Sequence, residues 1–245
     1  YNSTSSSYKI AIAGSGTWAA GNNRGTGVQG AYGTGSQTAA ISMGGNLLPG
    51  VLSYNCETYD GTSWTEVNNI LARRYNGSAA GNSTAGLMFG GTNNLPAPGT
   101  LSFTESWNGT CWSEVNNLLV SNTHMCENIG TQTAAMSVGG NNQPATNENY
   151  NGTCWSELAD LNSGRGTSMG SGTSTAAMCA GGSPSPTGEC EQWNGTSWTE
   201  VQNLNTPRAS AGSAMQASYT TSLIFGGATP SSTAVTEEWN GTSWT

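Results

Sequence analysis

Charge is the scarcest property of this 245-residue chain. Only 8% of its residues are charged, with a single lysine (Lys9), a single histidine (His124) and a net charge of −8. Because no run of basic residues occurs, the chain lacks the electrostatic footprint that nucleic acid or an anionic membrane surface would attract. No apolar stretch reaches the ~18 residues of a membrane-spanning helix. We therefore expect no nucleic-acid partner and no membrane insertion.

Metal ligands and catalytic groups are also few. A copper site would need several histidine, tyrosine and cysteine ligands, which a chain with one histidine cannot supply. None of the six cysteines lies in a Cys-x-x-Cys pair, and no Ser/His/Asp triad can be assembled around His124. We expect no metal, no cofactor and no catalytic residue, and the sequence assigns no individual binding residue.

A repeated hexapeptide dominates what is present. The copy at residues 193–198, Trp-Asn-Gly-Thr-Ser-Trp, recurs with small changes at 59–64, 107–112, 150–155 and 239–244, and a weaker copy ends at Trp18. All nine tryptophans occupy the first or last position of a copy. Each copy except the final one is followed by a Gly-Gly pair. The steps from the last tryptophan of the copy to the first glycine of the pair are 26, 26, 27, 26 and 28 residues in chain order. Repeats of roughly 40 to 50 residues are typical of propellers and of some solenoids.

Each repeat carries signals for four short strands. A small apolar segment, such as residues 38–45, ends at the Gly-Gly pair and is too short for a helix. A loop rich in Pro, Asn, Gly and Ser leads to a strand ending in the first aromatic residue. Asn-Gly then supplies a tight turn, because both residues tolerate positive φ. A strand from the second aromatic residue and a Gly- and Ala-rich segment complete one expected blade.

This order of features resembles the kelch motif: an apolar strand, Gly-Gly, a variable loop, Glu-x-aromatic, a turn and then Trp. Arginine ten residues after the tryptophan, at Arg74, Arg165 and Arg208, adds to the resemblance. Arg24 lies only six residues after Trp18, and Asn122 stands in the third repeat, so two copies depart from the pattern. The resemblance covers essentially the whole chain and implies a β-propeller, which limits exposed sheet edges by radial repetition.

We predict one all-β domain over residues 1–245, a five-bladed β-propeller of four-stranded antiparallel blades. The five Gly-Gly strands set the number of blades, with blade cores near 24–64, 73–112, 123–155, 165–198 and 208–244. Residues 8–18 and 236–245 would share the last blade, so that pairing of the two chain ends closes the ring and residues 1–18 supply the closing strand. Natural closure and a fragment of a longer array both remain open. The tryptophans are expected to be buried between blades.

The cysteines allow one disulfide candidate. Cys179 and Cys190 flank a single hairpin, so they form the best-placed pair. Cys111 and Cys154 share one repeat position, and Cys56 shares another with Cys190. Equivalent positions of a ring lie farther apart than the ~4.4–6.8 Å between Cα atoms that a disulfide spans. Free buried thiols are the alternative.

Glutamates recur at two positions of the repeat. One set precedes the first aromatic residue by two (Glu57, Glu105, Glu148, Glu191, Glu237), and the other follows the second by two (Glu66, Glu114, Glu157, Glu200). A ring of carboxylates could bind a cation or perform acid–base chemistry. Residues that recur in every blade are more typical of the scaffold, so we expect the first set to form buried ion pairs with the repeat arginines.

The loops after the Gly-Gly pairs vary while their flanks do not, and in a propeller they share one face. The repeats also resemble those of structural and tail-fibre proteins of aquatic bacteriophages, which implies a virion or extracellular surface. We predict a non-enzymatic binding or structural module that recognises a glycan or host-surface receptor through these loops. The alternative is an assembly subunit that docks neighbouring copies in a filament, fibre or capsid. A polysaccharide-acting enzyme, the third hypothesis, would depend on an unrepeated carboxylate such as Asp160 or Glu189.

Overall fold

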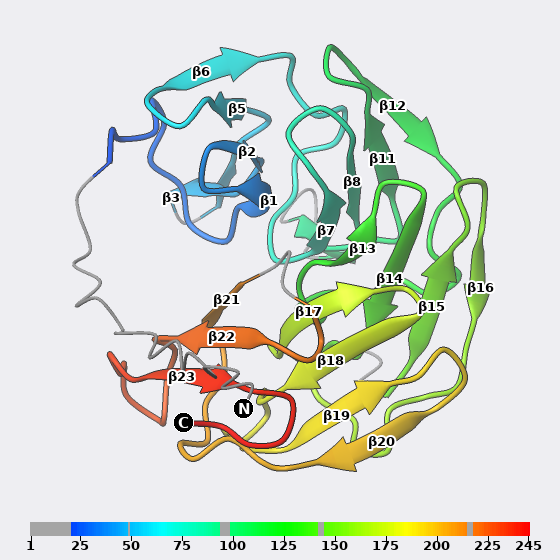
Figure 1. Cartoon of the computed structure of the whole chain (residues 1–245). Helices are drawn as coiled ribbons and strands as arrows, with labels where there is room; N and C mark the ends of the chain where they lie inside the picture. The colour runs from blue at the N-terminus through cyan, green and yellow to red at the C-terminus, as the bar shows by residue number, and fades with distance from the viewer. Residues whose placement is uncertain (1–20, 49, 94–98, 142–144, 215–217) are drawn as a thin grey trace, which may run out of the picture.

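The structure is a computed structural model that describes residues 21–48, 50–93, 99–141, 145–214 and 218–245. Five antiparallel sheets are arranged in a ring in the order of the chain (Figure 1). A cavity lined by residues of all five blades lies at the axis of the ring, and we call the space at this axis the central channel. The described part of the chain contains strands and no helix. The predicted five-bladed all-β propeller is confirmed.

Blades one to four each contain four strands, ordered from the channel outward as they occur in the chain. Blade one contains β1 (Tyr32–Ser36), β2 (Ala39–Met43), β5 (Cys56–Tyr59) and β6 (Trp64–Val67). Blade two contains β7 (Ser78–Gly81), β8 (Gly86–Phe89), β11 (Thr104–Trp107) and β12 (Trp112–Val115). Blade three contains β13 (Ile129–Thr131), β14 (Ala134–Val138), β15 (Asn147–Tyr150) and β16 (Trp155–Glu157). Blade four contains β17 (Met169–Thr173), β18 (Ala176–Ala180), β19 (Cys190–Trp193) and β20 (Trp198–Val201).

Blade five is a smaller sheet of β21 (Gly212–Ser213), β22 (Ser222–Phe225) and β23 (Thr236–Trp239). An isolated bridge joins Trp239 to Trp244, and Glu238 and Thr245 exchange two backbone hydrogen bonds of 2.9 and 3.0 Å. The C-terminal residues therefore provide the outer edge of this blade. The predicted closing strand at residues 1–18 lies outside the described residues, so its pairing with residues 236–245 stays a prediction.

Two short ribbons decorate the loops that follow the Gly-Gly pairs. β3 (Asn46–Leu48) pairs with β4 (Val51–Leu52) in blade one, and β9 (Thr92–Asn93) pairs with β10 (Gly99–Thr100) in blade two. The sequence predicted loops here without strands. Local pairing satisfies backbone groups that would otherwise depend on water.

The Asn-Gly turn works partly differently from the prediction. Gly195 takes a φ of 94°, but Asn194 is not among the residues with positive φ. Asn194 Oδ1 instead accepts the backbone N–H groups of Thr196 and Ser197, both at 2.9 Å. Asp60 makes the same pair of bonds in blade one. The turn therefore selects Asn or Asp for a side-chain acceptor rather than for a left-handed backbone.

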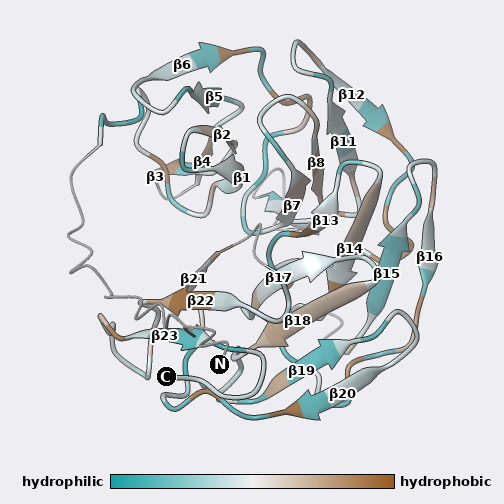
Figure 2. Cartoon of the chain, in the orientation of Figure 1, coloured by the Kyte–Doolittle hydropathy of each residue, from teal (hydrophilic) through white to brown (hydrophobic). Residues whose placement is uncertain are grey.

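At four of the five seams the tryptophans are buried between blades, as predicted. Trp107 and Trp112, whose ring centroids are 5.3 Å apart, lie in one buried cluster with Ile41 and Met43 of the preceding blade. The same arrangement recurs at the next three seams. Figure 2 shows how hydropathy changes across blade four: the second strand is hydrophobic and the outer two strands are hydrophilic.

The seam between blades five and one differs from the other four. Its aromatic pair, Tyr59 and Trp64, has a similar centroid separation of 5.1 Å but is only partly buried and belongs to none of the four clusters of described residues. Across the seam, Leu223 and Phe225 of β22 are also partly buried. Among the described residues, this seam is the least tightly packed.

Candidate functional site

The first set of recurring glutamates anchors the scaffold. Glu105 accepts the backbone N–H groups of Leu71 and Ala72, at 2.7 and 3.2 Å, in the linker that leads into its own blade. The fully buried Arg74 pairs with the same carboxylate at 3.0 Å. The equivalent ion pairs are Arg24–Glu57, Arg165–Glu191 and Arg208–Glu237. The predicted ion pairs are thus confirmed in four blades, buried in three of them and partly exposed at Arg24 in blade one. These carboxylates already accept hydrogen bonds from the scaffold.

Blade three lacks the arginine. Glu148 still accepts backbone N–H groups from Leu119 and Val120, at 2.8 and 3.2 Å. Asn122 occupies the arginine position and donates to the carbonyl of Gly139 at 2.7 Å instead of reaching the carboxylate. Burial raises the pKa of Glu148. In blade three the recurring carboxylate therefore has no arginine partner, unlike its counterparts in the other four blades.

The other candidate carboxylates do not converge on one site. Members of the second set are exposed on the outer strands (Glu66, Glu114, Glu157, Glu200). Asp160 is exposed in the linker after β16, and Glu189 lies 3.6 Å from Arg165. Within the described ranges, no group of three or more His, Cys, Asp or Glu side chains could hold a metal ion.

The best-placed disulfide candidate is wrong. Cys179 and Cys190 are free thiols, as are the other four cysteines. Cys179 lies in the cluster between blades three and four, whereas Cys190 lies in the cluster between blades four and five. The two side chains therefore leave opposite faces of one sheet, because their register differs by one residue and side chains alternate along a strand.

One end of the propeller, which we call the loop face, carries the variable loops and the linkers between blades. In the first four pairs the second glycine binds the linker to the next blade there; for example, Gly45 N–H donates to the carbonyl of Arg74 at 3.1 Å. Adjacent backbone bridges join Tyr75 to Thr92 and Gly166 to Ser183. Loop starts and linkers of neighbouring blades are therefore fixed at the same end of the inner strands.

The loop face also carries the large apolar side chains that remain exposed. Leu71 and Leu119 in the linkers are 56% and 59% exposed. Tyr54 and Phe103, which precede the third strand of their blades, are 37% and 39% exposed. The guanidinium of Arg73 lies 5.2 Å from the centroid of the Tyr54 ring. The remaining exposed members also lie in these loops and linkers (Leu47, Val51, Val120, Val235).

A ring of left-handed residues surrounds the channel at the loop-face end. Each blade contributes one residue at the same repeat position, with φ between 49° and 59° (Gly30, Asn76, His124, Thr167, Ser210). In blades two to five the backbone N–H of this residue donates to the carbonyl of its counterpart in the previous blade, at 2.6 to 3.1 Å (Asn76 to Gly30, His124 to Asn76, Thr167 to His124, Ser210 to Thr167). Left-handed φ is especially unfavourable for a β-branched residue such as Thr167. The four residues other than glycine therefore hold a strained backbone conformation, which glycine would adopt without strain.

Blade three breaks this ring's symmetry with one extra residue. From the ring position to the glycine that precedes the first hairpin there are five steps in blade two (Asn76 to Gly81) but six in blade three (His124 to Gly130). The extra residue forms a bulge at Glu127 and Asn128, where Asn128 has a φ of 61°. A bulge is a device that redirects a side chain beside a functional site.

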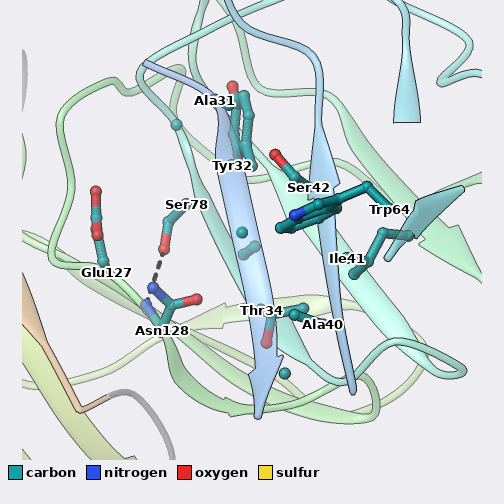
Figure 3. A pocket seen from close by; sticks show the side chains of 14 residues that line it. Ala31, Tyr32, Thr34, Ala40, Ile41, Ser42, Trp64, Ser78, Glu127 and Asn128 are labelled. Atoms are coloured by element: carbon teal, nitrogen blue, oxygen red, sulfur yellow. Dashed lines mark hydrogen bonds between the residues drawn. The ribbon is translucent and has the colours of Figure 1, made fainter. Parts of the chain in front are cut away.

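Neighbouring blades hold the bulge firmly. Ser78 of blade two donates to the carbonyl of Cys126 at 3.1 Å and accepts the Asn128 N–H at 3.4 Å, the dashed bond in Figure 3. With its amide oriented to satisfy both groups, Asn128 donates to the carbonyls of Ala79 and Gly33, at 3.1 and 2.8 Å. A Cβ on Gly170 of blade four would lie only 2.2 Å from the Glu127 carbonyl. The bulge therefore contacts blades one, two and four.

Glu127 faces the channel. It lines two cavities of about 320 Å³ each, one beside the inner strands of blades one and two and one at the ring. Its side chain is exposed to the solvent of the channel, and partial desolvation by the surrounding protein raises the pKa of its carboxyl group. Burial also lowers the pKa of His124 at the ring. Sequence reasoning missed Glu127, although the step of 27 rather than 26 residues between Trp112 and Gly139 marks the insertion.

Comparison with known proteins does not assign the chain to a family. No protein-family model matches it, and no curated protein matches it. In the part of the chain that the structure describes, no helix is long and apolar enough to cross a membrane. The residues alone must therefore support any functional conclusion.

Proposed function

We propose that this chain is a kelch-type propeller of an extracellular or virion surface that acts as a non-enzymatic binding module and recognises carbohydrate through its loop face. The observation that carries the proposal is the gathering of all the large exposed apolar side chains of the described residues on the loops and linkers of that face. Single exposed apolar side chains are common, but their concentration at one end of a protein is typical of an interaction surface.

The chemistry of the loop face favours a neutral, hydroxyl-rich ligand. Tyr54 and Phe103 offer aromatic rings at the surface, and Tyr54 adds a hydroxyl group. The surrounding loops are rich in Asn, Ser and Thr and poor in charge. Small-molecule sites combine apolar surface with a few placed polar groups. This combination suits a sugar, whose C–H face contacts a ring while its hydroxyls bond to amides.

The test is a glycan array followed by affinity measurement on the best glycan. Tyr54→Ala and Phe103→Ala should each weaken binding about tenfold, the equivalent of ~1.4 kcal/mol. Thr196→Ala, in an exposed turn between outer strands, is the matched control and should bind normally. Absence of glycan binding together with tight binding to a protein subunit would reject the carbohydrate proposal.

A second candidate function is assembly with neighbouring copies in a fibre or capsid. The partly buried Tyr59, Trp64, Leu223 and Phe225 at the blade five–blade one seam favour it, because this seam offers apolar surface on the side of the ring. Light scattering and electron microscopy of the purified chain separate the two functions. A monomer at high concentration argues against assembly.

A further inference from the structure

The central channel contains a carboxylate whose negative charge no other described residue balances. Glu127 has no ion pair within the described ranges, and burial is the sole cause of its pKa shift. Every described arginine is engaged elsewhere: four form the scaffold ion pairs, and Arg73 lies over Tyr54. Figure 3 shows the Glu127 side chain standing apart from the other lining residues.

Contacts with neighbouring blades hold the inserted residue that provides this charge in place. Ser78, Asn128 and Gly170 hold the bulge from three directions, as described above. The Glu127 side chain is exposed to the channel, so a group of opposite sign that enters the channel can reach it directly, and the surrounding protein strengthens that attraction relative to bulk water. The channel is therefore organised to receive a cation.

The ring around Glu127 supplies neutral hydrogen-bond acceptors. The Thr123 hydroxyl donates its single proton to the carbonyl of Asn76 at 2.7 Å. Its contact with His124 Nδ1 at 3.2 Å must therefore use the proton on Nδ1, which leaves Nε2 with a free lone pair. Because burial lowers the pKa of His124, the imidazole stays neutral and does not compete as a cation. Asn76 and Ser210 line the same cavity and add amide and hydroxyl oxygens.

We propose that the central channel is a binding site for a small molecule that carries a primary ammonium group, with Glu127 as its counter-ion. An ammonium has three N–H donors, which match one carboxylate and two neutral acceptors such as His124 Nε2 and the Asn76 amide oxygen. The cavities of about 320 Å³ lie at the lower end of small-molecule sites, which suits a ligand of monosaccharide size.

A metal ion fits the channel less well. Calcium takes six to eight oxygen ligands and zinc takes about four N or S ligands. Within the described residues, no group of three His, Cys, Asp or Glu side chains could supply such a set. One carboxylate with scattered neutral acceptors is sufficient for an ammonium group and poor for a dehydrated divalent cation. The inference does not depend on what the loop face binds.

The experiment uses His124 as a reporter, because it is the chain's only histidine and gives a single imidazole Cε1–H resonance. The full chain is titrated with D-glucosamine at constant pH, and D-glucose serves as the neutral counterpart. Glucosamine should shift the resonance to saturation, and glucose should leave it unchanged. Glu127→Gln, which keeps the shape and removes the charge, should weaken glucosamine binding at least tenfold.

Glu200→Gln is the matched control, since it removes the same charge from the exposed face of β20 and should bind like the unaltered protein. Circular dichroism establishes that Glu127→Gln is folded, and ethanolamine provides a second ammonium probe if glucosamine is sterically excluded. Equal binding by Glu127→Gln overturns the proposal. The proposal is also overturned if neither ammonium probe shifts the resonance. It is overturned as well if calcium shifts the resonance in the unaltered protein but not in Glu127→Gln, while the ammonium probes have no effect.

Discussion

Truncation of one tryptophan at two equivalent positions tests whether packing between blades stabilises the ring. Trp198 is 5% exposed and lies in the nine-residue buried cluster between blades three and four. A buried indole removes roughly 200 Å² from water, or about 5 kcal/mol at ~25 cal/mol/Å², which is an upper bound. Measured losses for buried Trp→Ala are about 3–5 kcal/mol. Trp198→Ala should therefore lower the melting temperature by roughly 6–20 °C.

Trp64→Ala is the internal control. Trp64 sits at the same turn with the same kind of aromatic neighbour, at 5.1 Å compared with 5.5 Å for the Trp193–Trp198 pair. It borders a cavity and belongs to no buried cluster of described residues, so its truncation enlarges a space that already exists. The loss should be at least about 1 kcal/mol smaller than for Trp198→Ala.

The assay is equilibrium unfolding in urea followed by far-UV circular dichroism, because the substitutions alter tryptophan fluorescence directly. Near-UV signals collected in parallel establish whether unfolding is a single transition, which the free-energy comparison requires. Equal losses at the two positions would refute the argument. The tryptophans would then act within their own hairpins, and packing between blades would contribute little.

Further predictions concern charge and thiol accessibility. Glu105→Gln should destabilise the protein by about 3–5 kcal/mol in urea unfolding, because Arg74 is left buried and unpaired. Glu148 has no arginine partner, so Glu148→Gln should destabilise the protein by only about 1 kcal/mol. Equal losses of stability in the two variants would contradict this reasoning. Burial raises the pKa of Glu127, so the folded protein binds more protons than the unfolded chain above pH ~4.5, and stability falls as pH rises. The melting temperature of Glu127→Gln should therefore exceed that of the unaltered protein by a margin that widens from about pH 4 to about pH 8, and a constant margin would exclude this effect. A thiol reagent should rapidly label the two cysteines exposed at the turns (Cys111, Cys154) in the folded protein and all six cysteines in urea. Rapid labelling of four or more cysteines in the folded protein would show that the seams between blades open.

Blade three concentrates the departures from the repeat. It has Asn122 in place of the arginine, the only histidine, and the inserted residue at Glu127. Scaffold residues recur because every blade must solve the same packing problem. A group that serves a ligand on the axis is needed only once, so the irregular blade is the place to look for binding chemistry.

The repeat, the number of blades, the strand order and the burial of most tryptophans could be predicted from the amino-acid sequence, because they depend on local periodicity and on contacts repeated in almost every blade. The sequence also predicted the Arg–Glu pairs, since paired charges of opposite sign recur in phase. The faces that Cys179 and Cys190 occupy could not be predicted in this way, because a shift of one residue in strand register moves a side chain to the other face of the sheet. Only closure of the ring brought Glu127, His124 and Asn76 to one channel, since residues from separate blades meet at the axis through the curvature of the whole array.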